Sequence, residues 1–536
     1  MKKDYKSYLK NVTIPVLVYG AFTGVLVGTI VYFFKLVAEW LTEKGTELYH
    51  VAQQKPLVAV AMFAGAIVLA FAMYFLQKWA PETKGGGIPR AEGVLRGLLT
   101  FRWLRTGIAV IFNSWISFFV GLPLGSEGPS VLLGTAIGGG TCRLPLSHDS
   151  WNRYIMTGGA CAGFAVATGA PLTGILFAVE EAHKRFTPMI LLMSIVSVLF
   201  GVGISNVWAG LIGHEPMALF NVAEFMGTFS MKEVWVPVLL GIAVALFACL
   251  YNVFVFFVGK MYDTKLAKIP QWARLVIVFV LTVAIGLIVV GKFNGASALF
   301  GGGGLIVNLA QNASGTIPLA VLFVVLVVRF FMIAFATGSG VTGGVFIPML
   351  SIGALVGSLM AELFVLLGMP VELYGTVVII TMSAFMGACT RAPITAIVFV
   401  VECTWNFSNL FYVAIAVFVS YLICEVFKVE PLYDVLLERM MEKQNHGKKH
   451  QILKFTYVVQ EGAFAVSKAV RDILWPANTR VSEIVSGNKG GMDDDGERKM
   501  HIGDVVTLFV QTYDEEQTEK ELQDILGKQL SQTNLG

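Results

Sequence analysis

Residues 168–180 read TGAPLTGILFAVE, and residues 390–402 read TRAPITAIVFVVE. Most positions of the two stretches are identical, and their offset is 222 residues throughout. A second pair follows at an offset of 219: GSEGPSVLLGTAIG at 125–138 and GVFIPMLSIGALVG at 344–357. Glycine and proline coincide at four positions of this pair. Two repeated stretches in the same order indicate that the chain consists of two duplicated halves.

The composition is that of a membrane protein. Hydrophobic residues make up 56% of the 536 residues, charged residues only 14%, and the mean hydropathy is +0.71. Apolar runs that could cross a bilayer recur, such as LVIVFVLTVAIGLIVVG from residue 275. The sequence therefore predicts an all-α polytopic membrane protein with a transmembrane domain at 1–445, whose halves span about 13–215 and 230–440. Basic stretches at 1–10 and 438–450 predict that both termini are cytoplasmic.

Glycine-rich loops that end in proline precede several apolar helix patterns. Proline suits the first turn of a helix, and the free N–H groups there attract anions. Such backbone at membrane depth must be buried or line a cavity. We therefore expect several helix starts to converge on a small anion. The GGGG at 301–304 lacks the Lys-Ser/Thr of a phosphate loop. The five prolines concerned are Pro89, Pro129, Pro171, Pro348 and Pro393.

One acid stands in such a loop, Glu127 in GSEGP. A carboxylate on a glycine loop at a positive helix start can occupy the site of the anion and leave it when protonated. This would make Glu127 a gate, a competitor of the anion and a proton carrier. The alternative is a helix-capping acid that never moves. Acids inside membranes are costly and usually functional, which favours the gate.

Four motifs together resemble the CLC chloride channels and chloride/proton antiporters: GGGIP (85–89), GSEGP (125–129), GGVFIP (343–348) and EPLY (430–433). The resemblance runs from about residue 13 to about 440. It implies a homodimer with one pore per subunit, in the cell membrane, each subunit being two inverted halves of tilted and incomplete helices. It also implies pore-loop roles for Gly125, Ser126, Gly128, Pro129, Gly87, Ile88, Pro89, Gly344 and Pro348.

The resemblance also assigns individual roles. Glu127 is similar to the external gating glutamate and Glu181 to the internal proton-transfer glutamate of the antiporters. The anion-binding positions that it implies are Gly86, the backbone N–H groups of Val345 and Phe346, and the hydroxyl of Tyr433. Glu181 favours a secondary active chloride/proton antiporter over a passive, voltage- or ligand-gated chloride channel. A more remote alternative is a membrane-anchored effector sensor.

The chain departs from the family pattern twice. Most members that prefer chloride have serine where Gly86 stands, which leaves selectivity against nitrate or bromide open. Many members also have arginine or lysine where Ser126 stands, so a cation beside the outer mouth is missing. We expect no enzymatic activity, cofactor, metal site or nucleic-acid partner.

Several polar residues have two interpretations each. Arg329 and Arg391 either line an anion path or pair with a buried acid or carbonyl. Glu180 aligns with Glu402 across the repeat, which favours a structural role for both. His183 either delivers protons or is a solvated surface histidine.

Residues 452–536 are soluble in composition and predict a small cytoplasmic α+β domain. Strands are expected from about 452 and 504, helices at 463–475 and 514–527, and a turn or hairpin at 486–499. The pattern resembles the TrkA-C (RCK C-terminal) domain of potassium transport regulators. This resemblance implies dimerisation and a regulatory site for a small nucleotide such as cyclic di-AMP. The alternative is a dimerisation or stability module without a ligand.

Overall fold

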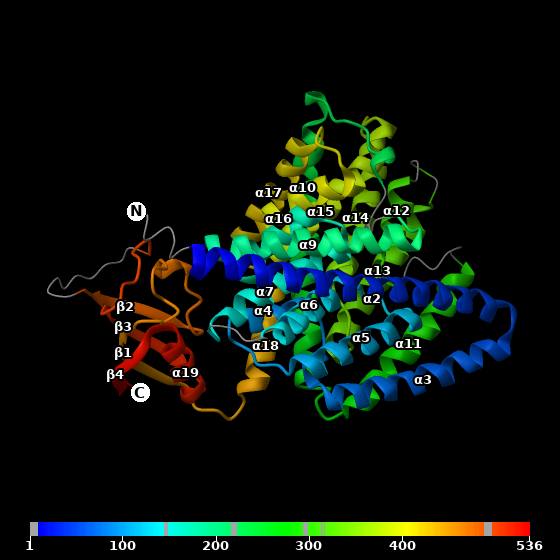
Figure 1. The fold of residues 1–536 in the computed structure, drawn as a ribbon. Coiled ribbons are helices and arrows are strands. Elements are labelled where there is room, and N and C mark those ends of the chain that lie inside the picture. The colour runs from blue at the N-terminus through cyan, green and yellow to red at the C-terminus, as the bar shows by residue number, and fades with distance from the viewer. Residues whose placement is uncertain are drawn as a thin grey trace.

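The computed structural model describes residues 9–143, 148–215, 222–292, 299–311, 315, 317–486 and 496–535. Helices dominate, and a small sheet lies at one end (Figure 1). Among the described residues, nine helical segments are long and apolar enough to cross a membrane. The prediction of a polytopic helical protein with a small α+β domain is confirmed.

The first half of the helical domain is a succession of long and short helices. They are α2 (Ile14–Gln54), α3 (Pro56–Trp79), α4 (Gly87–Leu95), α5 (Trp103–Val120), α6 (Glu127–Thr141), α7 (Trp151–Thr168), α8 (Pro171–Phe177) and α9 (Pro188–Ile212). A π-helical turn, Ala178–Ala182, continues α8.

The second half repeats the succession of long and short helices. They are α10 (Trp235–Asp263), α11 (Gln271–Lys292), α12 (Gly303–Gln311), α13 (Leu319–Ser339), α14 (Phe346–Leu366), α15 (Tyr374–Thr390), α16 (Pro393–Thr404), α17 (Leu410–Val426) and α18 (Leu432–Asn445).

Helix lengths vary far more than a simple bundle would require. Helix α2 has 41 residues and is about 60 Å long, twice the thickness of a bilayer core, whereas α4 with 9 residues cannot span it. The α6–α7 and α14–α15 pairs occupy equivalent places in the two halves and pack extensively. Every residue of α15 is buried, so this helix lies in the protein interior.

The C-terminal domain is a four-stranded antiparallel sheet in the order β2-β3-β1-β4. Its elements are β1 (Gln451–Val459), β2 (Thr479–Val485), β3 (Val505–Thr512), α19 (Glu515–Leu526) and β4 (Gly527–Asn534). Alternate residues of β1 and β3 enter the core, as their apolar alternation predicts. Most of the predicted hairpin at 486–499 lies outside the described residues.

The helix expected at 463–475 is absent; this segment forms turns and a short 3-10 helix at Val470–Asp472. Its apolar side chains pack into the cores of two different domains, which explains why the helix prediction was wrong. Ala465 and Ile473 belong to the core of the C-terminal domain, whereas Phe464 belongs to the core of the helical domain. Packing against two surfaces thus overrides a helical periodicity.

The same segment attaches the C-terminal domain to the start of α7. The Phe464 ring packs against the rings of Trp151 and Tyr154, at centroid distances of 5.5 and 6.0 Å. The Leu474 N–H donates to the Tyr154 hydroxyl at 2.9 Å, and the Arg153 guanidinium donates to the carbonyl of Trp475 at 2.9 Å. The two domains are therefore joined by specific contacts in addition to the linker.

Candidate anion site

All five proline-containing helix starts exist as predicted, with the proline in the first turn of α4, α6, α8, α14 and α16. Three of them meet. The backbones of Gly125 and Gly344 exchange hydrogen bonds of 2.7 and 2.8 Å. A Cβ on Gly87 would lie 1.9 Å from the Gly128 oxygen, and a Cβ on Gly128 would lie 2.8 Å from the Gly344 Cα. Only glycine permits this approach of α4, α6 and α14.

The other two helix starts are already neutralised. The Glu402 carboxylate accepts from the N–H groups of Leu172 and Thr173, at 2.7 and 2.9 Å, and thereby caps α8. Across the repeat, the Glu180 carboxylate accepts from the N–H groups of Ile394 and Thr395 and caps α16. The expected convergence of several helix starts on an anion therefore concerns α4, α6 and α14, because a carboxylate already satisfies α8 and α16.

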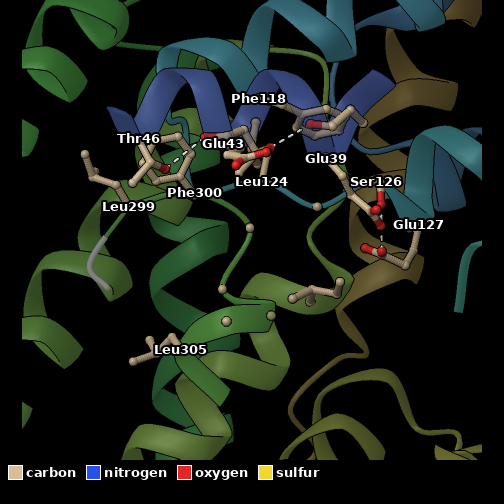
Figure 2. A pocket seen from close by; sticks show the side chains of 18 of the residues that line it. Glu39, Glu43, Thr46, Phe118, Leu124, Ser126, Glu127, Leu299, Phe300 and Leu305 are labelled. Atoms are coloured by element: carbon tan, nitrogen blue, oxygen red, sulfur yellow. Dashed lines mark hydrogen bonds between the residues drawn. The ribbon is translucent and has the colours of Figure 1, made fainter. Parts of the chain in front are cut away.

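Glu127 is the first residue of α6 and is fully buried. Its Oε1 accepts from the Ser126 hydroxyl at 2.8 Å, whereas Oε2 has no hydrogen-bond partner among the described residues. The carboxylate folds back over the loop, since a Cβ on Gly125 would lie 2.5 Å from Oε2. It lines a cavity of about 610 Å³, opposite Glu39 and Glu43 of α2 (Figure 2).

The start of α14 is held by aromatic packing between the two halves. The Phe346 ring lies 5.2 Å from Phe164 of α7 and 5.3 Å from Phe399 of α16, nearly perpendicular to both. Val345 precedes the helix, and both residues are buried. The first N–H groups of a helix have no partner within it, so this fixed helix start can donate to an anion.

A second cavity of about 720 Å³ lies next to the start of α4 and includes Gly86. The two cavities share no lining residue within the described part of the chain. Basic residues outnumber acidic ones around the second cavity, and Asp263 is paired with Arg439 and Lys443 at 2.7 Å. The basic residues are Lys84, Arg90, Arg274, Arg439 and Lys443. This wall attracts anions towards α4.

Glu181 lies in the π-helical turn and is 4% exposed. Its Oε2 has no hydrogen-bond partner among the described residues. The Arg96 guanidinium fixes the turn by donating to the carbonyls of Glu181 and Ala182, each at 2.8 Å. The neighbouring Glu180 has a different task, because its carboxylate caps α16.

Sequence reasoning missed Glu92 on α4, which is 1% exposed and lies 3.7 Å from Arg96. Arg96, which donates to the Glu181 carbonyl, therefore links the two acids. The signal was a single acid in a short, mostly apolar helix, three residues after Pro89.

Tyr433 is the second residue of α18 and is 2% exposed. Its hydroxyl has no hydrogen-bond partner within the described residues. A buried hydroxyl of this kind normally has a partner. Helix α18 packs against α4, where Leu437 contacts Gly93. A hydroxyl donor is thus available beside the helix that borders the second cavity.

The two arginine candidates are structural. Arg329 donates to the carbonyls of Leu299 and Gly301, each at 3.0 Å. Arg391 donates to the Val429 carbonyl at 2.8 Å and pairs with Glu425 at 3.0 Å. Both arginines thus follow the pairing interpretation. The His183 Nε2 lies 2.8 Å from the Thr157 hydroxyl, so this histidine is not a solvated surface residue.

Comparison with known proteins agrees with this arrangement. The sequence model of the voltage-gated chloride channel family matches residues 65–425. The chain therefore belongs to this family, the CLC proteins. It is similar to the crystal structure of a slow cyanobacterial Cl⁻/H⁺ antiporter, with a TM-score of 0.71 and 29% identity, covering 80% of this chain and 99% of that one.

More distant structures share the fold. A eukaryotic CLC transporter has a TM-score of 0.65 and 20% identity, covering 80% of this chain and 74% of that one. A CLC-type fluoride/proton antiporter has a TM-score of 0.62 and 17% identity, covering 79% of this chain and 98% of that one.

Proposed function

We propose that this chain is a secondary active transporter that exchanges chloride for protons. The observation that carries the proposal is the position of Glu127: a buried carboxylate at a helix start, facing a cavity, with one oxygen free of hydrogen bonds among the described residues. An ionised Glu127 competes with an anion for the N–H groups at the starts of α6 and α14. A protonated Glu127 loses that attraction and frees the path.

The path of the anion follows from the two cavities. Chloride approaches α4 through the cationic second cavity and reaches the N–H groups of Val345 and Phe346. The Tyr433 hydroxyl serves as a further donor. Chloride then leaves past Glu127 into the other cavity. The glycine contact between α4, α6 and α14 keeps the route narrow, so that only a small anion passes.

The path of the proton needs a second acid on the side of the C-terminal domain. Glu181 fits this role because it is buried, has an oxygen free of partners among the described residues and lies in a fixed turn. Glu180 does not, since its carboxylate caps α16. The pair Glu127 and Glu181 therefore favours coupled exchange over a passive channel.

The assembly that we propose is a homodimer in the cell membrane with both termini in the cytoplasm. Leu172 and Ile394 are the second residues of the short helices α8 and α16 and are 60% and 53% exposed. The carboxylate caps beside them are polar, and lipid cannot solvate polar backbone. A second copy of this chain that covers this face would remove the free-energy cost of exposing these polar groups to lipid.

The C-terminal domain is proposed to be a TrkA-C-like module that regulates transport by binding a small nucleotide such as cyclic di-AMP. Its contacts with Arg153 and Tyr154 support this role, because α7 packs against α6, which carries Glu127. A ligand that changes the docking of the domain would thereby act on the gate.

The test is proton movement in proteoliposomes under an imposed chloride gradient. We expect wild-type protein to drive protons uphill, and Glu127→Gln and Glu181→Gln each to abolish proton movement while chloride flux persists. Glu180→Gln is the matched control, because it changes a neighbouring acid that caps a helix, and it should remain coupled. Chloride flux without proton movement in the wild type would instead identify a channel.

A further inference from the structure

One polar residue near the gate has no role in the mechanism above. Lys35 lies in the middle of α2, and its side chain is 6% exposed. It lines the same cavity as Glu127. A lysine at this depth is costly unless it is paired or functional.

The charges around this cavity are otherwise negative. Glu39, Glu43 and Glu127 line it, and Lys35 is its only cationic side chain among the described residues. The carboxylates Glu39 and Glu43 come from the same helix α2 and face the gate loop (Figure 2). Without Lys35, this mouth would repel the anion that has to pass it.

The gate loop itself supplies no compensating charge. Position 126 is a serine, whose hydroxyl is bound to Glu127 at 2.8 Å. The cation at this cavity comes instead from α2, about ninety residues earlier in the chain.

The Lys35 ammonium has two neighbours. It donates to the Ala167 carbonyl at 2.6 Å and lies 3.7 Å from Glu39. Ala167 is in the last turn of α7, where carbonyl groups lack helical partners. This bond places the charge next to the cavity, because it ties a flexible side chain to a rigid helix end. It also offers the simpler role of a helix cap, which a test must separate.

We propose that Lys35 is the outer anion-attracting charge of this transporter, replacing a basic residue of the gate loop. It raises the local chloride concentration at the mouth and offsets Glu39 and Glu43. This inference rests on the proposed anion transport, but not on its coupling to protons.

The experiment measures chloride flux into proteoliposomes as a function of chloride concentration. For Lys35→Met we expect the half-saturating concentration to rise roughly two- to tenfold, the effect of one charge at this range, and to rise less at high ionic strength. Lys35→Arg should resemble the wild type. Lys44→Met is the matched control, because Lys44 is an exposed residue of α2 that pairs with Glu47 at 2.8 Å.

The decisive variant moves the positive charge from position 35 to position 126. Ser126→Arg in the Lys35→Met background should restore the wild-type half-saturating concentration, and a pure helix cap could not be restored this way. An unchanged half-saturating concentration in Lys35→Met, or no rescue in the double variant, would overturn the proposal. If Lys35→Met does not fold, Lys35→Gln, which keeps a hydrogen-bond donor at position 35 without the charge, takes its place in both comparisons, and the same two outcomes would overturn the proposal.

The outcomes for the two proposals are separable. Wild-type chloride flux without proton movement would end the antiporter proposal and leave the Lys35 comparison intact, because only chloride flux is read. A wild type without any anion flux would overturn both.

Discussion

At the scale of single residues, adjacent glycines in one loop have opposite constraints. A Cβ on Gly87 would collide with the backbone of α6, whereas a Cβ on Gly86 would meet nothing closer than Pro89 Cδ at 3.7 Å. Gly86 also borders the second cavity. The absence of a serine hydroxyl at position 86 is therefore not imposed by space, and a side chain there can be restored.

Gly86→Ser is expected to fold and to raise the preference for chloride over nitrate by roughly tenfold, since it adds one hydroxyl donor near the anion. The ratio of chloride to nitrate flux in proteoliposomes measures this. Gly86→Ala adds the Cβ without the hydroxyl and should keep the wild-type ratio. Equal ratios in both variants would show that position 86 does not contact the anion.

At the scale of helices, the duplication creates a reciprocal cap. Glu180 at the end of the α8 helix caps α16, and Glu402 of α16 caps α8. Each carboxylate receives two backbone N–H groups and a threonine hydroxyl. Of the five proline-containing helix starts, this exchange leaves α4, α6 and α14 able to serve an anion.

Glu402→Gln should destabilise the protein by about 1–3 kcal/mol, because the helix start loses a charge and at least one hydrogen bond. Thermal unfolding of the purified protein measures the loss, and proton coupling should persist. Glu425→Gln is the comparison, since the Glu425 side chain is 51% exposed and its ion pair should contribute less than about 1 kcal/mol. Equal losses of stability in the two variants would argue against a capping role of Glu402.

At the scale of the whole molecule, the docked C-terminal domain buries a charge at its boundary. Lys468 is 4% exposed, and its ammonium lies 3.8 Å from the centre of the Phe464 ring and 5.8 Å from that of Trp151. Burial lowers the pKa of Lys468 from 10.5 to about 8, against the attraction of Asp524. Folding and docking therefore favour the neutral amine.

The sign of the pH dependence follows. Between pH 8 and 10.5 the unfolded chain binds more protons at Lys468 than the folded chain, so stability rises with pH in that window. Lys468→Met has no charged ammonium to bury on folding. It should therefore be more stable than the wild type at pH 7.5, by about 3 kcal/mol at most. The difference should shrink at pH 9.5. Thermal unfolding of the full chain at both pH values tests it, and a constant difference would contradict it.

The sequence by itself determined the features that depend on local chemistry. Long apolar runs specify membrane helices, prolines after glycine loops specify helix starts, and the 222-residue repeat specifies two halves. Glu127 was identified because an acid in an apolar glycine loop is costly wherever it folds. The strands β1 and β3 were predicted for a similar reason, since their alternation is local; β4 is polar and has no such signal.

Only the tertiary structure decided which helix starts face an anion and which are capped. The glycine contact of α6 with α14 and the reciprocal caps join residues more than two hundred positions apart, and Gly87 of α4 meets Gly128 of α6 from another helix. Glu92 beside Glu181 and Lys35 beside Glu127 are similar cases, because no pattern within one helix predicts a partner on another. Residues 463–475 show the converse: contacts with two domains outweighed a local helical pattern. Charges and backbone dipoles act through space, so their partners are fixed only when the chain has folded.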